Sequence, residues 1–218
     1  MVTATPQPDK LRRRLPRQER ERLIIDEAVR FFAEVGFEGQ TRALAQRLGV
    51  TQPLLYRYFP DKESLIERVY QEVFEGGWDP AWETALADRT RPLADRLHEL
   101  YRNYTLVNFS YERVRLFMFA GLKDVAIANR YLDFVREHLF KPLAREVRFT
   151  AGLDLAEPVS EAEIEVVAGL HGAIGYVGLR RWVYSAQNSM DVEASVTGLV
   201  ETFVNGAPAT FRILANKQ

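Results

Sequence analysis

Residues 41–59 read TRALAQRLGVTQPLLYRYF, and this stretch decides the fold. The pattern predicts two short helices joined by a turn at residues 48–51. Gly49 can end the first helix because glycine adopts a positive φ at little cost. Thr51 is a good N-cap for the second helix, and Pro53 falls in its first turn, where no N–H is needed. Two helices this short are unstable alone, so they must pack on a neighbour.

That neighbour is a longer predicted helix on the amino-terminal side. Apolar residues recur at steps of three and four from Leu23 onward, and a helix of about 18 residues is expected to begin near Pro16 and to end at Gly36. The small Ala45 lets the two short helices cross closely. The side chains expected to face inward are Leu44, Leu48, Val50, Leu55 and Phe59.

The second short helix has a polar outer face, as the recognition helix of a helix-turn-helix does in the DNA major groove. Gln52 stands at its amino end, where base edges are read, and glutamine pairs bidentately with adenine. Arg42, at the start of the preceding helix, has the fork geometry that matches guanine. The remaining outward side chains suit phosphates. The candidate DNA-binding residues are therefore Arg42, Thr51, Gln52, Pro53, Tyr56, Arg57, Tyr58 and Lys62.

Charge is unevenly distributed along the chain. The first 60 residues hold 11 Lys and Arg against 7 Asp and Glu, and the rest hold 18 against 23, although the net charge of the whole chain is −1. A basic head on an acidic body suggests that the first part meets a polyanion. No acidic residue lies between Gly39 and Pro60, which favours a phosphate partner over an acid-dependent active site.

Residues from about 18 to 70 closely resemble the DNA-binding domain of the tetracycline-repressor (TetR) family of bacterial transcription regulators. The centre of the resemblance is EVGFEGQTRALAQRLGVTQPLLYRYFPDKESLIERVY, residues 34–70. The resemblance implies an all-helical, homodimeric repressor, with a three-helix DNA-binding domain followed by a larger domain that binds a small molecule and dimerises.

The resemblance also assigns roles to individual residues. It implies that Arg42 and Gln52 read bases and that Pro53 touches the groove. Its phosphate contacts fall on Tyr56, Tyr58 and Lys62. The chain is one residue shorter than the family pattern just before Leu44, so either Gln40 or Thr41 caps the second helix, and the reach of Arg42 is open.

Helical periodicity continues to the end of the chain, with no alternating pattern typical of strands. The expected fold class is all-α, with an N-terminal three-helix helix-turn-helix domain and a larger helical ligand-binding and dimerisation domain. The expected divisions are a disordered basic tail over 1–16, a helix-turn-helix domain over 17–62, and a ligand-binding and dimerisation domain over 63–218. A helix over about 61–75 is expected to be the one continuous link between the two domains.

Aromatic stretches with polar residues among them mark an expected effector site, because a mostly apolar cavity with a few polar groups suits a small ligand. The candidates are His98, Tyr101, Asn108, Phe117, Tyr131, Phe134, His138 and His171. For each aromatic residue the alternative is a place in the hydrophobic core. For each histidine the alternative is a bond to the backbone.

Glycines recur every three residues in the predicted helix 160–186, which begins with a capping box from Ser160 to Glu163. The four are Gly169, Gly172, Gly175 and Gly178. They cost a helix about 3–4 kcal/mol relative to alanine, and the close approach of another helix would offset that cost. In the TetR family the last two long helices form a dimer bundle, which would be 160–186 and 191–205 here. A kinked or strand-like segment is the alternative, and no element is assigned after Gly206.

The motifs of common enzymes are missing from the sequence. Its three histidines show no metal-binding spacing, and its lack of cysteine excludes disulfides and thiolate chemistry. We therefore expect no enzymatic activity, no cofactor and no metal. A signal peptide and an apolar run of roughly 18 residues are also absent, which favours a cytoplasmic protein without a membrane partner.

The expected partners are double-stranded operator DNA, a second copy of the chain and a small-molecule effector. Two other functions remain open. One is a helical small-molecule-binding or catalytic bundle in which the N-terminal module only packs. The other is a module that binds a protein through the exposed face at residues 56–58.

Overall fold

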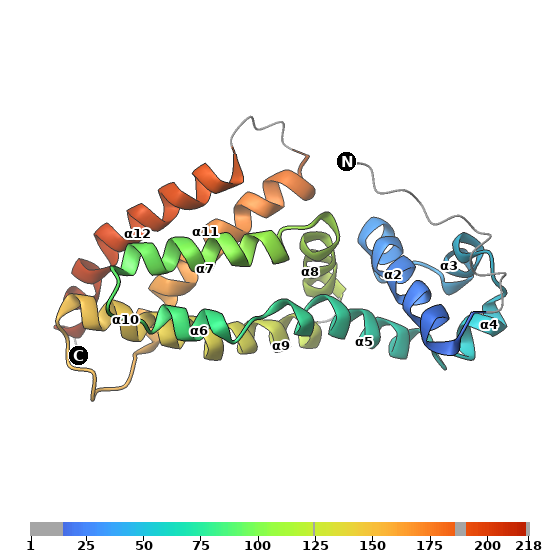
Figure 1. The fold of residues 1–218 in the computed structure, drawn as a ribbon, viewed down its shortest axis with the longest axis horizontal. Coiled ribbons are helices and arrows are strands. Elements are labelled where there is room, and N and C mark those ends of the chain that lie inside the picture. Colours follow the sequence, from blue (N-terminus) through green and yellow to red (C-terminus); the bar gives the residue numbers. More distant parts are fainter. Residues whose placement is uncertain (1–14, 124, 186–190, 217–218) are drawn as a thin grey trace. The chain divides into compact units, whose positions relative to one another are not determined.

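The computed structural model describes residues 15–123, 125–185 and 191–216 (Figure 1). These residues form helices and connecting turns and no strand, so the all-α prediction is confirmed. The α-helices are α2 (Arg17–Val35), α3 (Thr41–Leu48), α4 (Gln52–Tyr56), α5 (Lys62–Val73), α6 (Ala81–Leu86), α7 (Leu93–Asn108), α8 (Tyr111–Lys123), α9 (Val125–Val135), α10 (Lys141–Ala151), α11 (Glu161–Trp182) and α12 (Val192–Ala215). A 3₁₀ turn follows α5 at Glu75–Gly77, and a π-helical turn joins α9 to α10 at Arg136–Phe140. The predicted tail over 1–16 lies outside the described residues except for its last two.

The described chain forms two compact units. The first contains the residues up to Gly77 together with Tyr111–Ile127, and the second contains Trp78–Ser110 together with the residues from Ala128 onward. The chain therefore passes between the units three times, and the expectation that one helix is the only link was wrong. The unit boundary also differs from the expected division after residue 62, because α5 and α8 both pack on α2.

The first unit has its core between α2 and the helices that cover it. Ile24, Ala28 and Phe32 on α2 are fully buried, as are Leu44 of α3 and Leu55 of α4. These positions agree with the predicted inward face. Because α4 has only five residues, its place depends on this packing rather than on helix propensity.

Helix α8 closes the first unit over the carboxyl end of α2. The Nε and Nη2 atoms of Arg115 donate to the carbonyls of Ala33 and Glu34 at 2.6 and 3.2 Å. These carbonyls belong to the last turn of α2, which leaves them without partners in the helix. Gly36 ends α2 with φ of 78°, and a Cβ there would lie 3.1 Å from the ring of Phe119.

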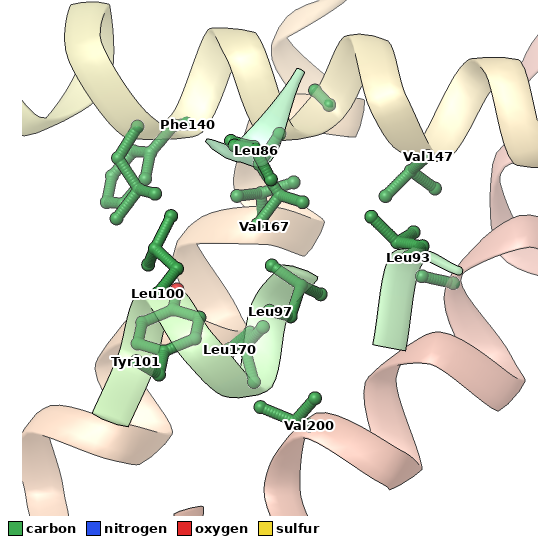
Figure 2. Packing of buried hydrophobic residues seen from close by; sticks show 14 of the residues in the cluster. Leu86, Leu93, Leu97, Leu100, Tyr101, Phe140, Val147, Val167, Leu170 and Val200 are labelled. Atoms are coloured by element: carbon green, nitrogen blue, oxygen red, sulfur yellow. The ribbon is translucent and has the colours of Figure 1, made fainter. Parts of the chain in front are cut away.

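The second unit is built around α7 and α12, with α10 and α11 packed against α12 (Figure 1). Figure 2 shows its hydrophobic packing, in which the ring of Tyr101 lies beside Leu97, Leu100 and Leu170. Two buried ion pairs, which the sequence did not reveal, cross this core. Arg96 binds Glu146 at 2.7 Å, and Arg148 binds Glu163 at 3.2 Å.

The π-helical turn has a local cause in the sequence. Pro142 cannot donate to the carbonyl of residue 138, and its ring would crowd that carbonyl in a regular α-helix. The N–H of Lys141 instead reaches back five residues to the carbonyl of Arg136. The wider turn admits the proline while Leu139 and Phe140 remain buried.

The last helix extends further than expected. α12 continues through Gly206 and Pro208 to Ala215, although both residues are typical helix breakers. Ala207 and Phe211 are buried in the core of the second unit, and this packing outweighs the local preference. The predicted helix at residues 191–205 is therefore present, but it extends ten residues further than predicted, to Ala215.

The glycine-rich segment lies in one helix, α11 (Glu161–Trp182), so the strand-like alternative is wrong. Ser160 caps α11 in the predicted capping box with Glu163. A Cβ added at Gly169, Gly172 or Gly175 would meet no atom of the described residues within 4 Å. The close approach expected of these glycines is therefore not made within the described chain. Gly178 is buried.

Candidate nucleic-acid interface and effector site

The predicted helix-turn-helix is present at α3 and α4. Gly49 adopts the left-handed conformation, with φ of 67°, and the N–H of Val50 donates to the carbonyl of Ala45 at 3.0 Å. Thr51 caps α4 by accepting from the N–H of Leu54 at 3.4 Å, and Pro53 occupies the first turn. The predicted roles of the glycine, the cap and the proline are confirmed.

The start of α3 shows which residue caps this helix, while the reach of Arg42 stays a prediction. Gln40 is the N-cap residue and makes no side-chain cap bond, and Thr41 is the first residue of the helix. Thr41 is buried, and its Oγ1 lies 2.8 Å from the hydroxyl of Tyr56. The Nε2 atom of Gln52 donates to the same Oγ1 at 2.9 Å and lies 3.4 Å from the hydroxyl of Tyr56. We call Thr41, Gln52 and Tyr56 the threonine cluster.

The threonine cluster restrains the amide of Gln52. Its two oxygen partners are neighbours, so a single hydrogen on Nε2 can serve both of them. The amide then still has its second hydrogen as a donor and Oε1 as an acceptor. That pair is what adenine requires in the major groove. Thr41 and Tyr56 are therefore positioning residues for Gln52. The phosphate contact implied for Tyr56 stays a prediction.

Three basic side chains of the candidate set lie at the surface of the first unit. Arg42 and Arg57 are exposed, and no hydrogen bond or ion pair joins them to another described residue. Arg57 lies over the ring of Tyr58 at 5.9 Å. Lys62 is half-buried in the first turn of α5, which Asp61 caps by accepting from the N–H of Ser64 at 2.7 Å. The hydrogen bonds from Ser64 lower the pKa of Asp61.

Arg47 is a basic residue of α3 that is already engaged within the unit. Its Nε atom lies 2.9 Å from Glu27 and its Nη1 atom 2.6 Å from Glu34, both on α2. The hydrogen bond from Arg47 holds the pKa of Glu34 below its usual value. This pairing fixes α3, the helix that carries Arg42, on α2.

In the second unit, three of the predicted effector residues come together around Tyr104. The hydroxyls of Tyr104 and Tyr131 lie 2.5 Å apart, and Nε2 of His171 lies 3.4 Å from the hydroxyl of Tyr104. The rings of Tyr101 and His171 are 6.2 Å apart. We call Tyr101, Tyr104, Tyr131 and His171 the tyrosine–histidine cluster. Asn108 adjoins it by donating to the backbone carbonyl of Tyr104 at 3.1 Å.

Burial shifts the titration of two members of this cluster. It lowers the pKa of His171 to about 4, so the imidazole is neutral near pH 7. It raises the pKa of Tyr101, so the phenol stays protonated. Sequence reasoning did not select Tyr104 as a site residue. The signal was its spacing of three residues from Tyr101, which places both on one face of α7.

The other effector candidates lie elsewhere. His138 pairs with Glu83 at 2.9 Å and stacks on Phe134, with ring centroids 4.3 Å apart. His98 pairs with Glu201 at 2.8 Å. Phe117 belongs to the first unit, where its ring lies near that of Phe74. The structure therefore does not bring these four candidates, His98, Phe117, Phe134 and His138, into the tyrosine–histidine cluster.

His98 lines an open groove of about 660 Å³ in the second unit. Both charged and apolar side chains line the groove, including Glu99, Arg102, Phe109, Trp182 and Glu193. The groove is more polar than the interior cluster and is the second place where a small molecule could bind.

Two further features of the described residues bear on function. No group of three or more His, Asp or Glu side chains among them is placed to hold a metal ion. Of their helices, none combines the length and the apolar character that crossing a membrane requires.

Comparison with known proteins connects this geometry to one family. Residues 24–69 match the family described as bacterial regulatory proteins, tetR family. No curated protein matches the chain. Among solved structures, the chain is similar to a TetR-like transcriptional regulator from Rhodococcus sp. RHA1, with a TM-score of 0.64, 21% identity, and coverage of 93% of this chain and 99% of the other.

Two more solved structures share the fold. The TetR family transcriptional regulator PfmR from Thermus thermophilus has a TM-score of 0.60 at 18% identity, with 84% of this chain and 97% of the other covered. AmtR from Mycobacterium smegmatis has a TM-score of 0.59 at 20% identity, with 90% and 96% covered. At these identities the likeness shows the fold, and it extends well beyond the residues matched in sequence.

Proposed function

The chain belongs, through residues 24–69, to the tetR family of bacterial regulatory proteins, and on that premise we propose that this DNA-binding transcriptional regulator is a ligand-responsive repressor. It binds an inverted-repeat operator as a homodimer, and a small molecule releases it. It works in the cytoplasm and has no catalytic role of its own.

The observation that carries the proposal is the arrangement of Arg42 and Gln52. Arg42 is exposed on α3, and the threonine cluster holds the amide of Gln52 at the amino end of α4. Arginine reads guanine and glutamine reads adenine by bidentate hydrogen bonds. The two side chains supply sequence readout, and Arg57, Tyr58 and Lys62 supply contacts to the phosphates.

Dimer formation is supported by the outward surfaces of α11 and α12. Gly169 and Gly172 are exposed on α11, and a Cβ at Gly198 or Gly206 of α12 would also meet nothing within 4 Å among the described residues. Tyr176 on the same part of α11 is 51% exposed. Small residues beside a large exposed apolar one suit the close packing of a second copy.

The test of the proposal starts from a randomised pool of duplex DNA, because the operator sequence is unidentified. Repeated selection with the purified protein should recover an inverted repeat with half-sites one helical turn, about 34 Å, apart, since two recognition helices must reach successive major grooves. A selected pool without symmetry, or no enrichment at all, would contradict a dimeric DNA-binding regulator.

The principal alternative is a helical bundle that binds a small molecule and whose first unit only packs. The tyrosine–histidine cluster is compatible with both functions. The exposed and unpaired Arg42 favours the regulator, because packing alone gives no reason to restrain the amide of Gln52 at the amino end of α4. Titrating the protein with duplex DNA at 50 and 200 mM salt separates the two, because DNA binding through several phosphates weakens by orders of magnitude over this range.

A further inference from the structure

Five buried side-chain atoms of the second unit have no hydrogen-bond partner among the described residues. Three are the Nε atoms of Arg96, Arg148 and Arg180, and the other two are the hydroxyl of Tyr101 and Nδ1 of His171. Tyr101 is fully buried in the core, among the leucines shown in Figure 2. A buried polar group without a partner costs about 1–3 kcal/mol, and such groups are rare in folded proteins. The hydroxyl of Tyr101 and Nδ1 of His171 both belong to the tyrosine–histidine cluster.

The rings that contact Tyr101 and His171 carry no charge. The ring of Tyr101 contacts those of Tyr104 and His171, and the ring of His171 contacts Phe140 at 5.3 Å between centroids. Arg96 and Arg148, the buried cations of this unit, are already paired with Glu146 and Glu163. A charged ligand at the cluster would be buried without a counter-charge, which is expensive.

We propose that the tyrosine–histidine cluster binds a neutral, mostly apolar effector that carries a hydrogen-bond acceptor for the hydroxyl of Tyr101 and a polar atom for Nδ1 of His171. The inference rests on the proposed function, since it names the chemical class of the effector. Aromatic rings on several sides favour a flat molecule, and a ketone, aldehyde, ester or amide oxygen meets the requirement for an acceptor.

The hydroxyl of Tyr101 defines the requirement more sharply than the imidazole does. A phenol in the apolar interior needs an acceptor for its single hydrogen. His171 is less specific because Nδ1 donates in one tautomer and accepts in the other, depending on which way the hydrogen between Tyr104 and Nε2 points. The test therefore turns on Tyr101.

Four probes of similar shape and different polarity test the proposal: acetophenone, toluene, benzoate and benzylammonium. The Kd of each is measured by calorimetric titration or, for weak binding, from the ligand dependence of the unfolding midpoint. Each measurement is made on the wild type, on Tyr101→Phe, and on Tyr184→Phe, which removes an exposed hydroxyl of the second unit as a matched control.

The expected result is a loss of affinity for acetophenone alone among the four probes. The Kd of acetophenone should rise about tenfold in Tyr101→Phe, which corresponds to one lost hydrogen bond, and should not change in Tyr184→Phe. The Kd values of toluene and of the two ions should be alike in all three proteins. Tyr101→Phe without ligand should be at least as stable as the wild type, because it removes an unpaired hydroxyl.

Several results would overturn the proposal. These are a failure of acetophenone to bind the wild type, an equal Kd in Tyr101→Phe, a larger loss for benzoate or benzylammonium than for acetophenone, or a clear destabilisation of ligand-free Tyr101→Phe. The affinity for the selected duplex, measured with and without each probe, tests the regulatory function separately. Acetophenone that binds through Tyr101 but leaves DNA affinity unchanged contradicts the regulatory role alone, whereas release of DNA by an ion alone contradicts the neutral effector.

Discussion

At the scale of single residues, the restrained amide of Gln52 carries the proposed recognition of DNA. Thr41 lies in one helix and Gln52 and Tyr56 in the next, so the cluster forms only once α3 and α4 have crossed. The sequence places Gln52 at the amino end of a recognition helix, but the spacing of residues along the chain does not reveal which hydroxyl meets its side chain.

Replacing Thr41 by valine tests this restraint. Thr41→Val keeps the shape of the side chain and removes the oxygen that accepts from Gln52, so the amide gains freedom. We expect about a 3- to 10-fold loss of affinity for the selected duplex, which corresponds to roughly one hydrogen bond, and weaker discrimination at the base pair that Gln52 reads. Fluorescence anisotropy on the duplex and on its single-base variants measures both quantities.

Thr150→Val is the matched control, because Thr150 is an exposed threonine of α10 whose hydroxyl donates to the carbonyl of Glu146 in its own helix. Equal losses on every base-pair variant for Thr41→Val would mean that the threonine cluster supports folding and not readout.

The neutral state of His171 predicts a pH dependence of stability. Its pKa is about 4 in the folded protein and 6.5 without burial, so the unfolded chain binds more protons between these values. Protonation of the unfolded chain at this histidine therefore does not affect the free energy of unfolding above pH 6.5. As the pH falls from 6.5 toward 4, it lowers the free energy of unfolding by about 3 kcal/mol in total. The free energy of unfolding in urea should fall more steeply with acid in the wild type than in His171→Phe.

His98→Phe provides the comparison for this experiment, because His98 is partly exposed beside Glu201. A His171→Phe variant whose acid dependence parallels that of the wild type would show that the imidazole is protonated in the folded state.

At the scale of elements, the turn between α2 and α3 depends on a glycine. A Cβ at Gly39 would lie 2.6 Å from both Phe31 and Val35, and Phe31 is buried. Gly39→Ala should therefore lower the free energy of unfolding by about 1–3 kcal/mol through overpacking. Gly76→Ala is a suitable control, since a Cβ there meets no described atom within 4 Å. Equal stabilities of the two variants in urea unfolding would contradict the close approach.

The glycines of α11 lead to a prediction about assembly. Gly172→Leu places a large side chain where a second copy would pack, so it should weaken the dimer in sedimentation without unfolding the chain. Ala162→Leu, at an exposed position in the first turn of the same helix, should leave the dimer intact. A Gly172→Leu protein that sediments like the wild type would remove α11 from the interface.

Local signals predicted some elements well and failed where distant packing decides. Gly36, Gly49, Thr51 and Ser160 end or begin helices as expected, because a cap or a positive φ acts within one turn. The sequence did not predict the end of α12, because Pro208 is a typical helix breaker. The helix continues past it because Phe211 is buried in the core, which no local signal indicates.

At the scale of the whole molecule, the path of the chain is the feature that sequence reasoning could not supply. Residues 111–127 join the first unit although the second unit both precedes and follows them. Their place depends on contacts such as Arg115 with the end of α2, which are distant in sequence. The two units are therefore joined by three covalent connections, at residues 77–78, 110–111 and 127–128, and the first of these follows α5.

The uneven charge of the chain agrees with DNA binding by the first unit. The excess of basic over acidic residues in the first 60 positions lies in and before the helix-turn-helix. In the second unit, the buried Arg96 and Arg148 are paired with Glu146 and Glu163. Binding to DNA should accordingly depend on individual arginines, Arg42 of α3 and Arg57 just after α4, and not on the net charge of the protein, which is −1.

The most direct test of the account compares Arg42→Ala with Arg145→Ala, which removes an equally exposed arginine from α10 of the second unit. Affinities are measured by fluorescence anisotropy on the selected inverted repeat and on duplexes with single base-pair changes. We predict that Arg42→Ala loses about 1–3 kcal/mol of binding free energy on the selected sequence and loses discrimination at one base pair of each half-site, while Arg145→Ala binds like the wild type. Equal affinities of both variants, or an equal loss for Arg42→Ala on every duplex, would contradict base recognition by this helix-turn-helix.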